Sequence, residues 1–227
     1  GDTSGGGDEE PTENPNASKP RYIWIDAAAN FPDFANSKEN IARDLALAKD
    51  AGFTDIVVDV RPTTGDVLFK TNHVDQVKFM YAWIGSNYTK VERTATWDYL
   101  QAFVDEARKQ GLRIHAAINT FVGGNQIDGG TGLLYRDQSK AAWATQMNMQ
   151  TGITSVMNTS ESAKFFNPAH PEVQTFLCNL LEDLASYDLD GIFLDRGRFL
   201  NLQADFSEES RKQFEAYMGG IKIQNYP

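Results

Sequence analysis

The sequence predicts an α/β fold of the (β/α)8-barrel type, of which this chain holds about the first four βα units. Four apolar, strand-like runs alternate with four amphipathic helical patterns, and this order implies a parallel sheet with right-handed crossovers. Long segments follow the strands and short ones follow the helices, as in barrels that elaborate one face into a site. A doubly wound nucleotide-binding sheet is the alternative, but residues 26–34, DAAANFPDF, replace the glycine-rich turn that it needs after its first strand.

The first two units are delimited by helix caps and stops. Residues 21–31 are expected to form a strand that ends in a loop, and Ser37 to cap a helix that ends at Gly52. Residues 53–62 follow as the second strand. Its run Ile56–Val58 is apolar without alternation, which indicates a strand covered on both faces.

The third unit lies between two long loops. Residues 63–95 are expected to form the first loop, and Thr96 to cap a helix that ends at Gly111. Residues 112–121 are the third strand. The second excursion, residues 122–166, contains a glycine-rich turn and a short helix.

The fourth unit begins with Pro171 at the first position of a helix, inside whose apolar pattern Cys178 is expected to be a buried, inert thiol. Residues 188–195 form the fourth strand. Ser207 opens a final helix whose inner side is predicted to carry Phe214, Tyr217 and Met218. Since these four units already use about 200 residues and a closed barrel needs eight, the remaining half of the barrel is expected outside this chain.

The composition of the chain and its first 20 residues indicate where the protein is located and which partners it can bind. The net charge of −10 over 227 residues argues against nucleic acid and anionic membranes as partners, and no apolar run approaches the ~20 residues of a membrane span. Residues 1–20 are acidic and rich in Gly and Pro, which predicts a disordered tether before a domain over residues 21–227. The leader resembles the spacer that follows the lipidated cysteine of Bacteroidetes lipoproteins. That resemblance implies an exported protein, periplasmic or at the cell surface, with an N-terminal lipid anchor.

Each predicted strand ends in a polar residue. Because side chains alternate along a strand, the last inward positions are Asp26, Asp59, Asn119 and Asp195, which would converge at one mouth of a barrel. Such residues also cap turns and helices, and this is the alternative for Asp26 and Asp59. Arg61 shares a face with Asp59 and is predicted to contact substrate with it.

Asp195 differs from the other strand-end residues because two arginines follow it. Arg196 and Arg198 are predicted to bind substrate or to hold Asp195 ionised, as a nucleophile or electrostatic stabiliser requires. Just before the third long helix, Asn167 and His170 are further candidates for substrate binding, although His170 is equally expected to cap that helix.

No metal site or cofactor is predicted. The three histidines, His73, His115 and His170, are far apart in sequence and belong to no H-x-H or H-E-x-x-H motif. This argues against a metal-dependent barrel hydrolase or polysaccharide deacetylase.

Residues 165–199, FFNPAHPEVQTFLCNLLEDLASYDLDGIFLDRGRF, resemble the family 10 glycosyl hydrolase-like proteins near the α-amylase clan. Residues 55–69 and 107–121 resemble the strand-two and strand-three segments of the same family. The resemblance implies a (β/α)8 barrel with a glycoside-cleaving site. Asp195 fits the place of the clan's strand-four nucleophile, whereas Phe193 stands where the clan has an arginine.

The leading hypothesis is therefore a glycoside hydrolase acting on a poly- or oligosaccharide, with Asp195 as nucleophile or base. Such enzymes usually need a second carboxyl group as proton donor, and in this family's fold it would come from a later strand, outside this chain. Aromatic side chains in the strand-end loops, among them Trp24, Tyr81, Trp83 and Tyr88, are candidates for stacking on sugar rings. The alternative is a non-catalytic carbohydrate-binding module on the same fold.

Overall fold

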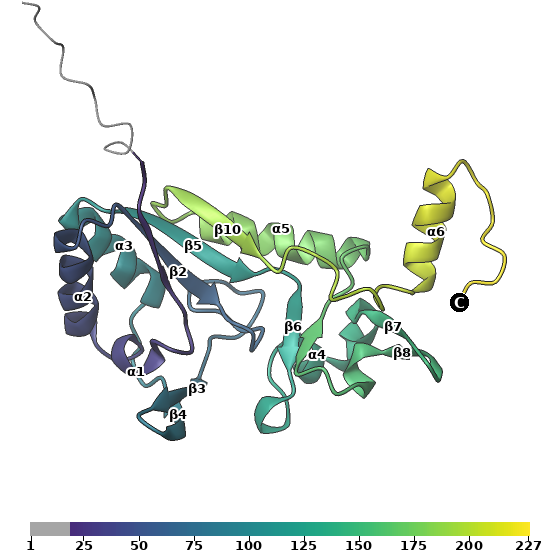
Figure 1. Ribbon diagram of the computed structural model, residues 1–227, viewed down its shortest axis with the longest axis horizontal. Helices are drawn as coiled ribbons and strands as arrows, with labels where there is room; N and C mark the ends of the chain where they lie inside the picture. Colours follow the sequence, from purple (N-terminus) through teal and green to yellow (C-terminus); the bar gives the residue numbers. More distant parts are fainter. Residues whose placement is uncertain (1–18) are drawn as a thin grey trace, which may run out of the picture.

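Four parallel strands form the central sheet of the computed structural model, which describes residues 19–227 (Figure 1). Their order is β1-β2-β5-β10, so each strand lies beside its predecessor among the four. The strands are β1 (Tyr22–Ile25), β2 (Asp55–Arg61), β5 (Arg113–Asn119) and β10 (Gly191–Asp195). This order confirms the predicted parallel sheet and its repeated βα units. The predicted tether, residues 1–20, lies almost wholly outside the described residues, and the location inferred from it stays a prediction.

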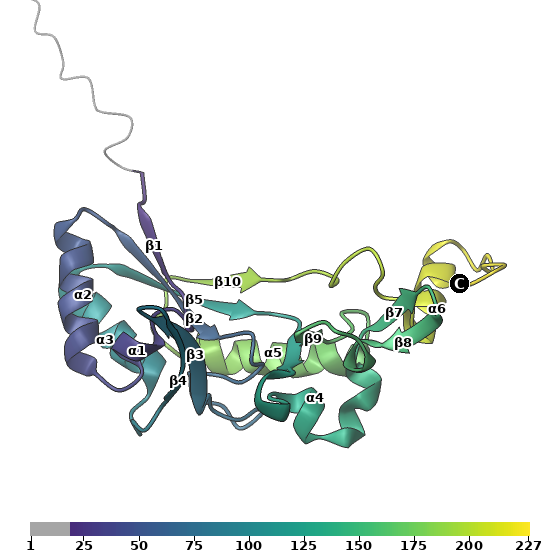
Figure 2. The same ribbon diagram turned by 60° about the horizontal axis from the view of Figure 1, so that its bottom comes forward.

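Helices α2 (Lys38–Asp50), α3 (Tyr99–Gln110) and α5 (Pro171–Ala185) cover one face of the sheet (Figure 2). As predicted, the Ser37 hydroxyl caps α2 by accepting from the Asn40 amide at 3.1 Å, and Gly111 ends α3 in the left-handed conformation, with φ 68°. The predicted cap at Thr96 was wrong. The Asp98 carboxylate accepts from the Gln101 amide at 3.1 Å, so α3 begins two residues later.

The opposite face of the sheet is open. Tyr22, Trp24 and Phe193 form an aromatic cluster there, with ring centroids 5.5 Å apart for Trp24–Phe193 and 6.0 Å for Tyr22–Phe193. All three side chains remain 36–47% exposed, and Leu194, on the other face of the edge strand β10, is 54% exposed. In a closed barrel this face would be the interior. The apolar residues of β10 are therefore typical of a buried strand, although they are exposed here.

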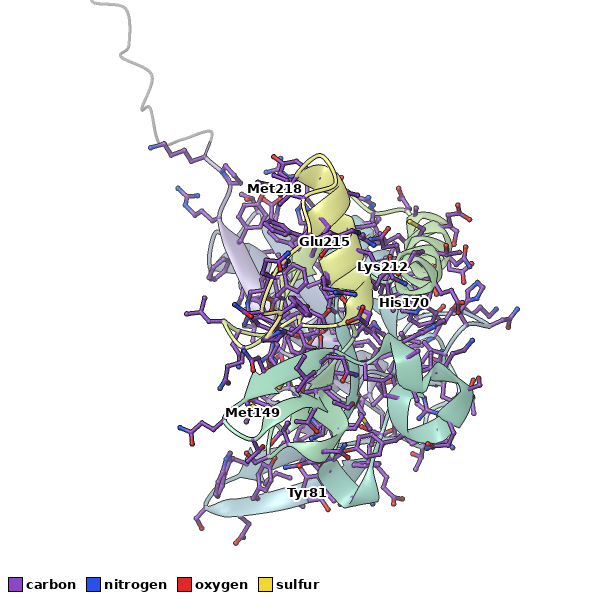
Figure 3. All side chains as sticks on the ribbon, turned by 90° about the vertical axis from the view of Figure 1, so that its right-hand side faces the viewer. Tyr81, Met149, His170, Lys212, Glu215 and Met218 are labelled. Atoms are coloured by element: carbon purple, nitrogen blue, oxygen red, sulfur yellow. The ribbon has the colours of Figure 1, made fainter. Side chains whose placement is uncertain are left out.

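Helix α6 (Glu208–Tyr217) stands apart from the sheet at the far end of the molecule (Figure 1). The prediction that it turns Phe214, Tyr217 and Met218 inward was wrong, since these side chains are 45–86% exposed. Its buried residue is Glu215, whose carboxylate accepts from Lys222 and from the Ile223 amide, both at 3.0 Å. Figure 3 shows Glu215 on this helix and Met218 at its C-terminal end. Cys178 was also mispredicted, because α5 turns it to solvent.

The long segments after the strands, predicted mostly as loops, contain short strands and helices. Between β2 and α3 lies an antiparallel hairpin of β3 (Phe79–Ile84) and β4 (Asn87–Glu92). Residues 122–166 contain two antiparallel strand pairs, β6 (Val122–Asn125) with β9 (Ala163–Phe165) and β7 (Gln146–Met149) with β8 (Gly152–Ser155). The same segment contains the short helix α4 (Leu133–Arg136). A one-turn helix, α1 (Phe31–Phe34), follows β1. Within residues 19–227, none of the helices is long and apolar enough to cross a bilayer.

Candidate active site at the carboxyl ends of the strands

The four strand-end residues predicted to converge do line one cavity. Asp26, Asp59, Asn119 and Asp195 surround a space of ≈ 120 Å³ at the carboxyl edge of the sheet. The strand register produces this arrangement, because Asp195 lies opposite Asn119 on the neighbouring strand. Three carboxyl groups thus share a small cavity in a molecule that already carries net negative charge.

Asp59 is the buried member of the cluster, with 7% of its surface exposed. Burial raises its pKa to about 7, and the nearby Asp26 and Asp195 charges add to the increase. Hydrogen bonds from backbone N–H groups, one of them from the Arg61 amide at 3.2 Å, partly lower the Asp59 pKa again. Near neutral pH the Asp59 carboxyl therefore holds a proton much of the time, and it can donate that proton or a hydrogen bond.

Asp195 is open to solvent at the end of β10. Its Oδ1 accepts from the Arg196 amide at 2.7 Å, and Arg196 also lines the cavity. Arg196 has φ 48°, a backbone conformation that costs energy for a residue with a side chain and that is often kept at functional sites.

The expected ion pair between Asp195 and a following arginine is absent from the described part of the chain. The Arg198 guanidinium instead donates to the carbonyl oxygens of Phe199 at 3.0 Å and Leu200 at 2.6 Å. Arg198 does not line the cavity. The hydrogen bond that the structure gives the Asp195 carboxylate therefore comes from the main chain.

Arg61 does not line the cavity either, although it was predicted to share a face with Asp59. A register shift between Asp59 and Arg61 places Arg61 opposite Ile118, one residue out of step. The guanidinium is fully buried and donates to the carbonyl oxygens of Asn119 at 2.5 Å, Thr120 at 3.2 Å and Val122 at 2.5 Å. Arg61 thus has no exposed surface for a ligand and instead ties the end of β2 to the loop after β5.

This clamp is reciprocal and remains charged. The Asn119 side-chain amide donates to the Arg61 carbonyl at 3.0 Å, which fixes the Asn119 side chain at the cavity. Burial lowers the pKa of Arg61 to about 10, so the guanidinium still carries its charge at neutral pH. Arg61 is therefore a positioning residue for the site.

Asp26 combines its two predicted roles. Its Oδ1 accepts from the Ala29 amide at 2.7 Å, which organises the turn after β1, and the residue also lines the cavity. The turn-capping interpretation and the site interpretation are therefore both consistent with the structure.

Asn167 and His170 do not join the cluster. Asn167 is buried, where its Oδ1 accepts from the Ala169 amide at 2.9 Å and its Nδ2 donates to the Ser207 hydroxyl at 3.0 Å. His170 caps α5, with Nδ1 accepting from the Glu172 amide at 3.2 Å (Figure 3). Of the two readings left open for His170, the structure shows the cap.

Sequence reasoning did not select Ala28, Thr63 and Met80, which also line the cavity. Met80 belongs to β3, so the hairpin forms part of the wall of the site. The signal was available in residues 79–92, where two strand-like runs flank a Gly85-Ser86 turn. Among residues 19–227, no group of three or more His, Cys, Asp or Glu side chains is arranged to hold a metal ion.

Residues 19–220 match the family model described as glycosyl hydrolase-like 10. The chain belongs to this glycosyl hydrolase-like family. It is 32% identical over 213 residues to an S-layer-related protein from Niallia circulans, a match that covers 90% of this chain and 13% of that protein. The family predicted from residues 165–199 is thereby confirmed.

Solved structures confirm the fold class. An α-L-fucosidase isoenzyme 2 from Paenibacillus thiaminolyticus matches 87% of this chain with a TM-score of 0.55 and 18% identity, over 26% of its own length. A hypothetical protein from Ruminiclostridium thermocellum matches 87% of the chain and 90% of its own length, with a TM-score of 0.52 and 14% identity. At these identities the likeness shows the fold, an α/β barrel-type sheet. The chain spans about an eighth of the curated relative and about a quarter of the fucosidase.

Proposed function

We propose that this protein is a glycoside hydrolase acting on an oligo- or polysaccharide, with Asp195 as nucleophile or general base. The observation that carries the proposal is the convergence of Asp26, Asp59 and Asp195 on one cavity at the carboxyl edge of a parallel sheet. Glycoside cleavage usually requires one carboxylate beside the anomeric carbon and one protonated carboxyl beside the leaving oxygen. A solvent-open Asp195 and a buried Asp59 supply these two kinds of carboxyl in one place.

Among the carboxyl groups of residues 19–227 that line the cavity, Asp59 is the one suited to hold a proton at neutral pH, because burial raises its pKa to about 7. In the proposal it donates a hydrogen bond or a proton to the bound sugar. A carboxyl on a later strand, outside this chain, is the other source of the catalytic proton. Asp26, Asn119 and Arg196 line the same cavity and are proposed to bind the sugar hydroxyls.

Further βα units are proposed to cover the open face of the sheet. Support comes from Trp24 and Phe193, which keep 45% and 36% of their surface exposed, and from the place of β10 at the edge of the described sheet. An edge strand with exposed apolar side chains is a liability for association. Units that pair with β10 would also complete the far wall of the site.

The test is hydrolysis of a panel of soluble polysaccharides. The release of reducing ends measures the rate. The wild-type protein is compared with Asp195→Asn and with Asp50→Asn, an exposed control on α2 away from the cavity. We expect Asp195→Asn to lose at least about 100-fold in rate, as for loss of a catalytic nucleophile, and the control to retain activity. Equal activity in all three proteins would remove Asp195 from the chemistry. Binding of a glycan without hydrolysis would favour the non-catalytic carbohydrate-binding module.

A further inference from the structure

A second, larger cavity continues from the acidic one. It has a volume of ≈ 320 Å³, and it shares Ala28, Thr63 and Met80 with the acidic cavity as lining residues. The acidic cavity, at ≈ 120 Å³, is smaller than the roughly 300–1,000 Å³ typical of small-molecule sites, whereas the second lies within that range. A ligand held at the carboxyl groups would therefore extend into this second space.

One wall of the second cavity is the β3–β4 hairpin. Phe79, Tyr81 and Trp83 alternate along β3 on one face, and the register places Tyr88 of β4 opposite Trp83 on that face. The Tyr81 and Tyr88 rings stack at 5.2 Å with 28° between their planes, and Tyr88 lies 5.2 Å from Trp83. The result is a row of rings that begins in the cavity and runs outward along the hairpin.

The outer rings of this row are free to contact a ligand. Trp83 is 68% exposed and Tyr88 is 56% exposed. Figure 3 shows Tyr81 on the hairpin at the margin of the molecule. Large rings left in water beside a cavity are a feature of recognition surfaces, since each presents an apolar face with a polar edge.

The inner ring is held in place by the neighbouring turn. Tyr81 Oη donates to Asp128 Oδ1 at 2.8 Å, and the Lys90 ammonium binds Asp128 Oδ2 at 2.7 Å. The same ammonium lies 4.2 Å from the centroid of the Phe79 ring. A ring that is fixed before binding loses little conformational freedom when a ligand stacks on it.

The opposite wall is neutral and polar. It contains Asn125, Gln126 and Ser162, and the Gln126 amide lies 3.3 Å from the Ser162 hydroxyl across the strand pair. Neutral amides and hydroxyls facing aromatic rings match a sugar, whose hydroxyl edge accepts and donates hydrogen bonds and whose C–H face packs on a ring. Charged side chains, which would favour an ionic ligand, are absent from the lining of this cavity.

We propose that the cavity between the β3–β4 hairpin and residues 125–127 is a second sugar subsite, and that Trp83 and Tyr88 extend it, so that the protein binds a chain of several sugar units. This subsite rests on the proposed function in that the acidic cavity supplies the first sugar position. The ring row then selects for chain length, because only a ligand longer than the acidic cavity reaches it.

The experiment measures binding of oligosaccharide ladders of two to six units, in malto-, cello-, xylo- and galacto- series, by titration calorimetry. The proteins are wild type, Trp83→Ala, Tyr88→Ala and Asp195→Asn, with Tyr217→Ala as the matched control. Tyr217 is an aromatic residue that is 86% exposed on α6, away from both cavities. Trp83→Ala and Tyr88→Ala change exposed side chains, so their folding is checked by an unaltered unfolding midpoint in urea.

We expect wild-type affinity to rise with chain length in at least one series. Trp83→Ala and Tyr88→Ala should weaken binding of the longest ligands about tenfold and of the shortest hardly at all. Asp195→Asn and Tyr217→Ala should keep the wild-type length dependence. Three outcomes would overturn the subsite: an affinity that does not depend on chain length, hairpin variants that bind like wild type, or no binding in any series. Full hydrolytic activity in Asp195→Asn alongside weakened binding in the hairpin variants would refute the catalytic role and leave the subsite standing.

Discussion

The carboxyl of Asp59 lies buried within electrostatic reach of the Asp26 carboxylate, and burial together with this charge raises the Asp59 pKa to about 7. Asp26 directly follows β1 and Asp59 lies near the end of β2, and the parallel pairing of these strands holds both residues at one edge of the sheet. A pair of carboxyl groups in which one is pushed toward the protonated form is the arrangement that acid–base chemistry at neutral pH requires.

Neutralising Asp26 is expected to lower the pKa of Asp59. In Asp26→Asn the side-chain oxygen still accepts from the Ala29 amide, so the turn is kept while the charge is removed. The measurement is a carboxyl ¹³C NMR titration of Asp59 in the variant and in the wild type. The exposed change Asp50→Asn is the control, and an Asp59 midpoint that stays in place in Asp26→Asn would show that the two groups are not coupled.

Asp59→Asn is expected to change the pH dependence of stability. The folded pKa of Asp59 is raised, so the folded state binds the extra proton between about pH 4 and 7 and loses stability as pH rises through this window. A shift from 3.8 to about 7 corresponds to a difference of up to about 4 kcal/mol in the free energy of unfolding. Relative to wild type, Asp59→Asn should therefore gain stability between pH 4 and pH 8. Urea unfolding at the two pH values checks this, and a difference that does not vary with pH would contradict it.

Replacing Arg61 is expected to destabilise the fold. Arg61→Met leaves three carbonyl oxygens, those of Asn119, Thr120 and Val122, without their buried donor. We expect a loss on the order of 3 kcal/mol in the free energy of unfolding. Arg198→Met is the matched control because Arg198 is exposed and donates only to nearby carbonyls, so its cost should stay below about 0.5 kcal/mol. Equal costs in urea unfolding would show that Arg61 is not the clamp.

The amino-terminal edge of the sheet is expected to contribute to acid sensitivity. Arg113 donates to both carboxylate oxygens of Asp55 at 2.8 Å and is the main reason that the Asp55 pKa lies well below its usual range. A lowered pKa gives stability that is present above about pH 4 and lost as pH falls toward the folded pKa. Since Arg113 is half exposed and screened by solvent, Arg113→Met should remove only part of this pH-dependent stability, and the acid-unfolding midpoint should move to higher pH. Acid unfolding followed by circular dichroism would contradict the assignment if the two midpoints coincide.

The strands and their polar ends could be predicted because their signals are local. Alternation fixes which side of a strand faces the cavity, and a glycine such as Gly111 marks the end of a helix through its own backbone. Since the strands are parallel and in chain order, residues that end them necessarily meet at one edge. The convergence of Asp26, Asp59, Asn119 and Asp195 therefore follows from the sequence pattern.

The misjudged residues depend on long-range geometry. The burial of Arg61 follows from a one-residue register shift against β5, which no pattern within β2 records. Phe214 and Tyr217 have helical spacing, yet α6 does not pack its apolar side on the sheet, so the pattern gives no burial. The β3–β4 hairpin is different, because the Gly85-Ser86 turn and its two flanking strand-like runs are local signals that predict a hairpin rather than a loop.

The location of a bound sugar tests the central claim most directly. We predict that a crystal structure of Asp195→Asn with the longest oligosaccharide it binds will show one ring between Asp26, Asp59 and Asn119, with the next rings running toward Tyr81 and Tyr88. A sugar seated elsewhere, such as the apolar pocket beside α6 lined by Phe206 and Phe214, would contradict the account.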